Sequence, residues 1–192
     1  MNFLAHLYFA DATPESRVAN LMGDYLKGRI AADWQPNLRD GVILHRRIDG
    51  YTDSHPLVLQ SAARLSARRR RFAGIILDIC YDHYLCRHWD RFSDQPLDRF
   101  IEDCYRQLSD YQGYLPESMQ RPLRLLIEQD WLSTYADPDT ICLVLDRVAS
   151  RLSQPQRMLG AGEEFIRNYS LFERDFLSFY PQLCQFVLLN KS

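Results

Sequence analysis

Apolar residues recur three and four positions apart along nearly the whole chain, and no stretch alternates apolar and polar residues as a half-buried strand would. Prolines and short Ser- and Asp-rich breaks divide this pattern into segments. The segments cover 2–10, 14–27, 38–51, a stretch that begins at 57, 68–89, 97–111, 116–135, 138–152 and 162–189. Pro181 is expected to kink or divide the last one. This pattern predicts an all-α fold.

The length of 192 residues is that of one domain, which can bury a core without disulfide or metal support. We therefore expect residues 1–192 to form a single compact helical domain. The five cysteines are scattered and include no CxxC pair. They predict reduced, buried thiols rather than a disulfide framework or a structural zinc site.

The charge and hydropathy of the chain argue against two classes of partner. A formal net charge of -2 at pH 7 provides no general attraction to nucleic acids or to anionic membranes. No apolar run approaches the length of a membrane span. His6 also interrupts the apolar N-terminal segment early, unlike the core of a secretory signal. We expect a cytoplasmic protein that binds neither nucleic acid nor membrane.

Potential metal ligands are concentrated in the first half of the chain, which holds all five histidines. This uneven distribution predicts a site assembled from several N-terminal helices. The histidines are His6, His45, His55, His83 and His88, and the same half also holds Asp24, Asp49, Asp53, Asp78 and Asp82.

Asp78 and Asp82 stand four residues apart beside an apolar stripe, so they share a helix face. Two carboxylates placed there repel each other and are costly to desolvate unless a cation lies between them. Oxygen ligands favour Mg²⁺ or Mn²⁺, and a neighbouring imidazole such as that of His83 moves the preference toward Mn²⁺, Fe²⁺ or Zn²⁺. The alternative is a pair of solvated or arginine-paired carboxylates.

His45 and Asp49 are also one helical turn apart, in the segment His45-Arg46-Arg47-Ile48-Asp49. The carboxylate either ligates a metal or orients the imidazole. Arg46 and Arg47 supply forked donors of the kind that hold phosphate oxygens. The alternative is a helix C-terminus whose cations interact with the helix dipole and whose histidine is merely packed.

His6 and Asp24 are both surrounded by apolar residues in the sequence. A lone histidine on an apolar face is more often a satisfied core residue than a ligand. The neighbouring acids favour a functional role for this pair.

A basic run links the fourth and fifth segments, at Arg64, Arg68, Arg69, Arg70 and Arg71. If the turn stays helical, Arg64, Arg68 and Arg71 stack on one face. Such a stripe attracts an acidic protein surface or a polyphosphate. The alternative is a solvated charged face, and no nucleic-acid-binding motif accompanies the run.

Several of these elements together resemble the bacterial acyl carrier protein phosphodiesterase family. They are the opening Met1-Asn2-Phe3-Leu4-Ala5-His6-Leu7, Gly23-Asp24, the His45 to Asp49 stretch with Thr52-Asp53, the Leu77 to His83 block, Arg87-His88-Trp89 and Phe179-Tyr180-Pro181. The resemblance implies a helical bundle distantly related to the HD-type metallophosphohydrolases. Asp82-His83 reverses the usual His-Asp order of those proteins, so their ligand assignment cannot be copied.

The resemblance also implies Mn²⁺-preferring hydrolysis of the phosphodiester between a serine of holo-acyl carrier protein and 4′-phosphopantetheine, with Mg²⁺ or Fe²⁺ as other possible ions. His6, Asp24, Asp78, Asp82 and His83 are the expected metal ligands. Arg46 or Arg47 is expected to offset charge on the phosphoryl oxygens. His45, oriented by Asp49, is expected either to protonate the leaving oxygen or to complete the metal shell.

The basic stripe is then expected to dock the acidic carrier protein through Arg64, Arg68 and Arg71. Two other functions remain open at this point. One is a phosphohydrolase acting on a nucleotide or small phosphate ester. The other is a noncatalytic helical module that binds acyl carrier protein.

Overall fold

A computed structural model describes residues 1–23, 25–26, 28, 30, 34–111, 115 and 117–191, with only the backbone of 117–119. Within these ranges the chain forms helices and turns and no strand, which confirms the predicted all-α fold. The helices are α1 (Phe3–Phe9), α2 (Pro14–Met22), α3 (Pro36–Ser54), α4 (Pro56–Arg64), α5 (Ala73–Arg87), α6 (Leu97–Tyr111), α7 (Glu117–Glu128), α8 (Trp131–Thr134), α9 (Pro138–Ala149), α10 (Ala161–Arg167) and α11 (Tyr169–Asn190).

Proline marks the start of four of these helices, because its fixed φ suits the first helical position and its missing N–H costs nothing there. These prolines are Pro14, Pro36, Pro56 and Pro138. Pro181 does not divide the last helix, since α11 continues through it. The predicted C-terminal helix is divided instead at Asn168, between α10 and α11.

The expected helix over 68–89 begins later than predicted. Helix α4 ends at Arg64, and Leu65 has extended backbone angles. A turn and a short 3₁₀ segment, Arg70–Phe72, then lead into α5. Arg64 therefore does not lie on one helix face with Arg68 and Arg71, and the condition for a continuous arginine stripe is not met.

Two other predicted helices differ in extent. Helix α2 ends at Met22, and Lys27, the predicted end, lies outside the described residues. The segment predicted over 116–135 forms two helices, α7 and α8, because Asp130 adopts a left-handed conformation with φ 47°.

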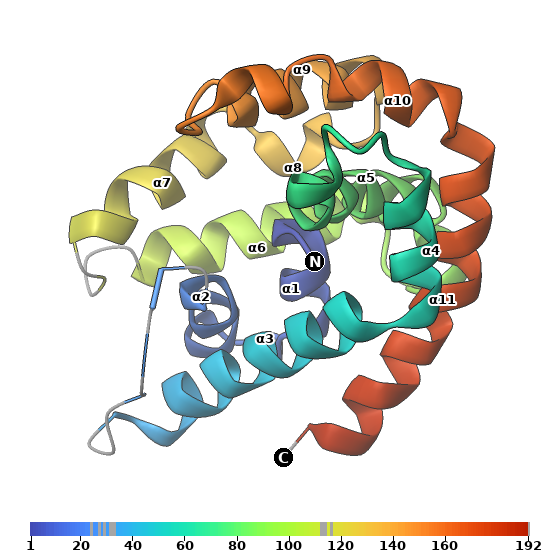
Figure 1. The fold of residues 1–192 in the computed structure, drawn as a ribbon. Coiled ribbons are helices and arrows are strands. Elements are labelled where there is room, and N and C mark those ends of the chain that lie inside the picture. Colours follow the sequence, from blue (N-terminus) through green and yellow to red (C-terminus); the bar gives the residue numbers. More distant parts are fainter. Residues whose placement is uncertain are drawn as a thin grey trace.

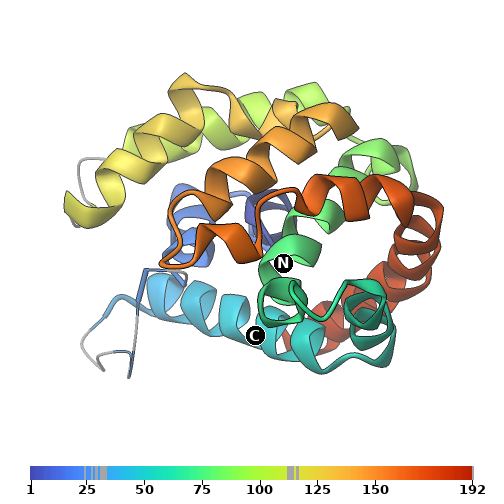
Figure 2. The same cartoon turned by 45° about the horizontal axis from the view of Figure 1, so that its top comes forward.

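One continuous apolar core joins all parts of the fold, and it includes residues from α1 to α11. Helices α1 and α5 lie in the middle of the molecule, and the N-terminus is enclosed by the surrounding helices (Figures 1 and 2). In α1, Leu4, Ala5, His6 and Leu7 are fully buried. Helix α2 packs closely on α3, since a Cβ at Gly41 would lie 2.5 Å from that of Ala19.

All five cysteines are free, and three of them are buried: Cys80, Cys86 and Cys104. The burial of these three agrees with the prediction, whereas Cys142 and Cys184 are only partly buried. No helix in the described part of the chain combines the length and the apolar character needed to cross a bilayer.

Candidate metal centre

Two imidazoles and one carboxylate meet where α1 crosses α3. His45 and Asp49 are one turn apart on α3, and His45 Nε2 lies 2.9 Å from Asp49 Oδ2. From α1, His6 Nε2 lies 3.1 Å from the other oxygen, Oδ1. The two rings stack with centroids 4.0 Å apart. One potential ligand atom of each of the three residues lies within 4.8 Å of the other two.

The charge states of this cluster suit a cation. Burial lowers the pKa of His6 to about 4, so its imidazole is neutral near pH 7. Burial opposes ionisation of Asp49, but the hydrogen bonds from His45 and His6 outweigh it and hold the pKa of Asp49 well below its usual range. A neutral imidazole and an ionised carboxylate are the forms that ligate metals.

A second carboxylate, that of Asp78 on α5, lies on the other side of Asp49. The α-amino nitrogen of Met1 stands between the two acids, 2.9 Å from Asp78 Oδ1 and 3.2 Å from Asp49 Oδ1. Burial lowers the pKa of this amine, but Asp78 and Asp49 raise it by more, to about 11. Burial also raises the pKa of Asp78. The acidic side of the cluster thus already stabilises a positive charge.

In the part of the chain that the structure describes, the acidic side of the cluster is open to solvent. The side chains of Asp49 and Asp78 are 33% and 28% exposed, whereas those of His6 and His45 are 0% and 3% exposed. A charged substrate group can therefore approach the carboxylates but not the rings.

Gly23 makes room for the ring of His45. A Cβ built on Gly23 would lie 2.0 Å from His45 Cδ2, closer than any real contact. Only glycine is compatible with this ring position. The neighbouring Asp24, an expected ligand, lies outside the described residues, so its role stays a prediction.

Asp82 does not join the cluster, although it shares α5 with Asp78. Its carboxylate is fully buried and accepts hydrogen bonds from Leu4 N at 2.7 Å and Ala5 N at 3.2 Å. Burial raises its pKa to about 7, against the effect of these two backbone N–H groups. Both oxygens face the first turn of α1.

His83 also lies away from the cluster. Its Nδ1 is 2.8 Å from the carbonyl oxygen of Tyr135, and its Nε2 is 2.6 Å from the hydroxyl of Tyr169. The structure thus engages both ring nitrogens of this expected ligand with protein groups. Whether Asp82 or His83 ligates a metal stays untested.

The two arginines of α3 point in different directions. Arg46 donates to the carbonyl of Leu26 at 3.1 Å. Arg47 donates to the carbonyl of Asn190 at 2.7 Å and lines a polar depression with Asp11 and Lys191. The expected contact of either guanidinium with a phosphoryl group remains a prediction.

The three expected docking arginines have different environments. Arg64 forms an ion pair with the buried carboxylate of Asp175. Arg68 and Arg71 are exposed in the segment between α4 and α5. The structure therefore leaves Arg68 and Arg71 open to solvent and engages Arg64 within the protein.

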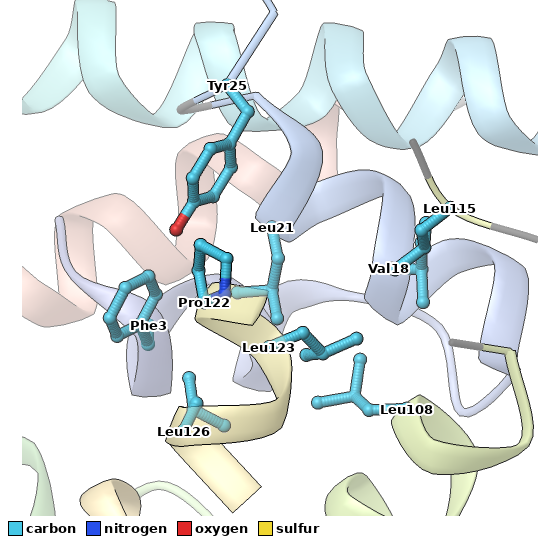
Figure 3. Close-up of a pocket in the computed structure, with 9 residues that line it drawn as sticks. All are labelled: Phe3, Val18, Leu21, Tyr25, Leu108, Leu115, Pro122, Leu123 and Leu126. Carbon is cyan, nitrogen blue, oxygen red and sulfur yellow. The ribbon is translucent and has the colours of Figure 1, made fainter. Parts of the chain in front are cut away.

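A separate pocket between α1, α2, α6 and α7 is lined by apolar side chains, among them Phe3, Leu21 and Leu126 (Figure 3). Its polar group in Figure 3 is the hydroxyl of Tyr25. Among the described residues, its lining includes no carboxylate or imidazole.

The residues present at the cluster fit a divalent metal ion. Two imidazole nitrogens and a carboxylate are a donor set suited to Mn²⁺, Fe²⁺ or Zn²⁺ more than to Mg²⁺. In addition, His6 Nδ1 is buried with no hydrogen-bond partner in the part of the chain that the structure describes. The ring is thus held through Nε2, the nitrogen that faces Asp49.

The four-residue spacing predicts the pairing of His45 with Asp49, whereas the expected ligand set groups His6 with Asp24, Asp78, Asp82 and His83. No spacing rule relates α1 to α3, so the stacking of His6 on His45 had no signal in the sequence. The contact of Gly23 with His45 also has no signal in the sequence, because glycine is common at helix ends for other reasons, such as a left-handed backbone conformation.

Comparison with known proteins identifies the family of this chain. The family model for acyl carrier protein phosphodiesterase matches residues 1–183. Proteins named acyl carrier protein phosphodiesterase from Photorhabdus laumondii and Pectobacterium atrosepticum are each 36% identical over 186 residues. The alignments cover 96% of this chain and 94% and 96% of those proteins. A protein of the same name from Klebsiella pneumoniae is 36% identical over 187 residues, with 95% of each chain covered.

No solved structure matches the chain, so the expected relationship to HD-type helical bundles stays a prediction. The match to the family model and to full-length relatives is decisive at the level of family. The chain belongs to the acyl carrier protein phosphodiesterase family.

Proposed function

We propose that this protein hydrolyses the phosphodiester that joins 4′-phosphopantetheine to a serine of holo-acyl carrier protein. The names of its relatives support the class of reaction and the substrate. The observation that carries the chemistry is the cluster of His6, His45 and Asp49, which brings two imidazoles and a carboxylate together at a solvent-accessible edge.

His6 Nε2, His45 Nε2 and the carboxylate of Asp49 would hold one divalent cation, with Mn²⁺ preferred over Fe²⁺ and Mg²⁺. Of the two roles expected for His45, we favour that of a ligand, because its Nε2 faces the same carboxylate as that of His6. A bound divalent cation supplies a water molecule of lowered pKa and polarises a phosphoryl oxygen.

The carboxylates of Asp49 and Asp78 set the direction from which the phosphodiester approaches. They are the exposed rim of the site. The ammonium group of Met1 pairs with both carboxylates, and a bound divalent cation would offset the negative charge that remains as a phosphate approaches. We therefore expect the proposed activity to depend on metal. The attacking water adds its oxygen to phosphorus, the bond from phosphorus to the serine oxygen breaks, and the serine oxygen takes up a proton. The products are apo-acyl carrier protein and 4′-phosphopantetheine.

Docking of the carrier protein would use Arg68 and Arg71. Both are exposed just before α5, the helix that carries Asp78. The exposed Ile75 lies between these arginines and Asp78 in the chain. An acidic helical partner would be attracted to this segment by charge. Arg64 would contribute less, because its guanidinium is paired with Asp175.

Intact-mass spectrometry of holo-acyl carrier protein tests this function. Incubation with the purified enzyme and Mn²⁺ should remove the mass of phosphopantetheine, and omission of the metal should prevent this. An unchanged mass in the presence of Mn²⁺, Mg²⁺ and Fe²⁺ would contradict the proposal. Faster hydrolysis of nucleotides or small phosphate esters than of holo-acyl carrier protein would show that the proposed substrate is wrong.

A further inference from the structure

We propose that Asp82 is a positioning residue: its buried carboxylate fixes the first turn of α1 and so holds His6 against Asp49 and His45. This inference rests on the proposed function for its catalytic meaning. The four-residue spacing from Asp78 predicts that Asp82 is a metal ligand. The proposal gives it a positioning role instead.

Helix α1 needs an anchor that its own sequence does not supply. It has seven residues, and isolated helices of this length are unstable in water. Its N-cap residue, Asn2, makes no side-chain cap bond, and its first turn contains no acidic residue. The N–H groups of the first turn would be unsatisfied inside the core, where this costs free energy.

Asp82 supplies this missing cap from another helix. Leu4 and Ala5 are the second and third residues of α1, the positions whose N–H groups an N-cap side chain normally receives. Each donates to a different oxygen of Asp82, at 2.7 and 3.2 Å. Two bonds to one rigid carboxylate restrict both the translation of the helix and its rotation about its axis. The two hydrogen bonds offset the free-energy cost of burying the charge of the carboxylate, and so does the positive end of the helix dipole, where the carboxylate lies.

The ring of His6 depends on this anchor, since it follows Ala5 directly. In the described residues its one hydrogen-bond contact is from Nε2 to Asp49, and its other ring contact is the stack on His45. Both partners belong to α3. A rotation of α1 would therefore separate His6 from the other two members of the cluster.

Asn2 gives a weaker second attachment. Its Nδ2 donates to the hydroxyl of Tyr135 at 2.7 Å, one neutral hydrogen bond compared with the two to the carboxylate. Helix α5 thus contributes to the site twice: Asp78 stands at its acidic rim, and Asp82, one turn later, sets the position of α1.

Two measurements on the Asp82→Asn variant test the proposal. The first is the NMR contact between the ring protons of His6 and His45 in metal-free protein with labelled histidine. The second is the affinity for Mn²⁺ by calorimetry. Asparagine keeps one acceptor but presents an NH₂ group to the second N–H. We expect the inter-ring contact to weaken or vanish and the Mn²⁺ affinity to fall about 10- to 100-fold, as for outer partners of other metal ligands.

Two further variants separate positioning from general stability. Ser61→Ala removes a buried hydrogen-bonded hydroxyl of α4, between Tyr81 and Asp175, and should lower thermal stability while leaving the inter-ring contact and the Mn²⁺ affinity unchanged. Asp82→Glu keeps both acceptor oxygens and the charge. It should retain the inter-ring contact and most of the affinity. If Asp82→Asn does not fold, Asp82→Ser, which removes the charge and leaves a single hydroxyl acceptor, takes its place with the same expected losses.

Each outcome decides the question. Loss of Mn²⁺ affinity with the ring contact intact would identify Asp82 as a ligand and overturn the proposal. An intact contact together with unchanged affinity would limit Asp82 to a structural role and overturn it as well. If wild-type protein binds no Mn²⁺, the proposed function fails, and the NMR contact still shows whether Asp82 positions His6.

Discussion

The imidazole rings of His6 and His45 stack with their centroids 4.0 Å apart, although the two residues belong to different helices. Asp49 lies against the Nε2 atom of each ring, with one carboxylate oxygen for each. Two imidazole nitrogens thus face one carboxylate, which also pairs with the ammonium group of Met1. This donor set is the basis of the proposed site for a divalent cation.

Asp49→Asn should abolish most of the activity on holo-acyl carrier protein. The amide retains the shape of the side chain but removes the negative charge that both imidazoles face. Loss of several kcal/mol of transition-state stabilisation by the cation corresponds to a rate at least about 100-fold lower. The rate of phosphopantetheine release measures this effect. The exposed Asp94 gives a matched control, since Asp94→Asn should retain the wild-type rate, and equal rates for both variants would contradict the account.

Gly23→Ala should impair activity by displacing His45. The added methyl would lie 2.0 Å from His45 Cδ2, so either the ring or the end of α2 must move. The expected result is weaker Mn²⁺ binding and slower turnover, with helical content retained in circular dichroism. Gly50→Ala is the matched control, because a Cβ there meets nothing within 4 Å. It should stabilise α3 by about 0.5–1 kcal/mol, and a Gly23→Ala enzyme as active as Gly50→Ala would refute the steric argument.

The metal-free protein should show two opposing dependences of stability on pH. The pKa of His6 is about 4 in the native state, against 6.5 for an unperturbed histidine. Between these values the unfolded chain binds the additional proton, so stability rises with pH. The pKa of Asp82 is about 7, raised from 3.8, so here the native state binds the additional proton and stability falls with pH.

These two contributions nearly cancel between pH 4.5 and 6.5. Asp82→Asn removes the falling contribution, so its free energy of unfolding should rise by up to about 1.4 kcal/mol per pH unit relative to wild type. His6→Gln should show the opposite slope. Urea unfolding at several pH values measures both, and parallel curves for wild type and the two variants would disprove these protonation states.

Charge reversal of the exposed arginines should weaken binding of the carrier protein. The double variant Arg68→Glu, Arg71→Glu is expected to raise KM for holo-acyl carrier protein several-fold, reduce its dependence on salt and leave kcat nearly unchanged. Arg99→Glu, at an exposed arginine of α6, is the control. Arg64→Glu should instead lower stability, because it leaves the buried carboxylate of Asp175 beside a like charge. A KM equal to that of wild type in the double variant would exclude this docking surface.

The sequence predicts what repeats along a helix and misses what depends on how helices meet. His45 and Asp49 were paired correctly because a four-residue spacing places side chains on one face. The same rule grouped Asp82 with Asp78, but it could not show that Asp82 faces the first turn of α1. The arginine stripe required a helix through 65–72, and the extended backbone of Leu65 interrupts it. The position of His6 follows from tertiary packing alone.

A crystal structure of the enzyme with Mn²⁺, with anomalous scattering from the metal, tests the proposed centre most directly. The account predicts a strong anomalous peak within bonding distance of His6 Nε2, His45 Nε2 and the carboxylate of Asp49, and its absence from crystals of Asp49→Asn. A peak bound by Asp82 and His83 instead, or no peak in active enzyme, would contradict it.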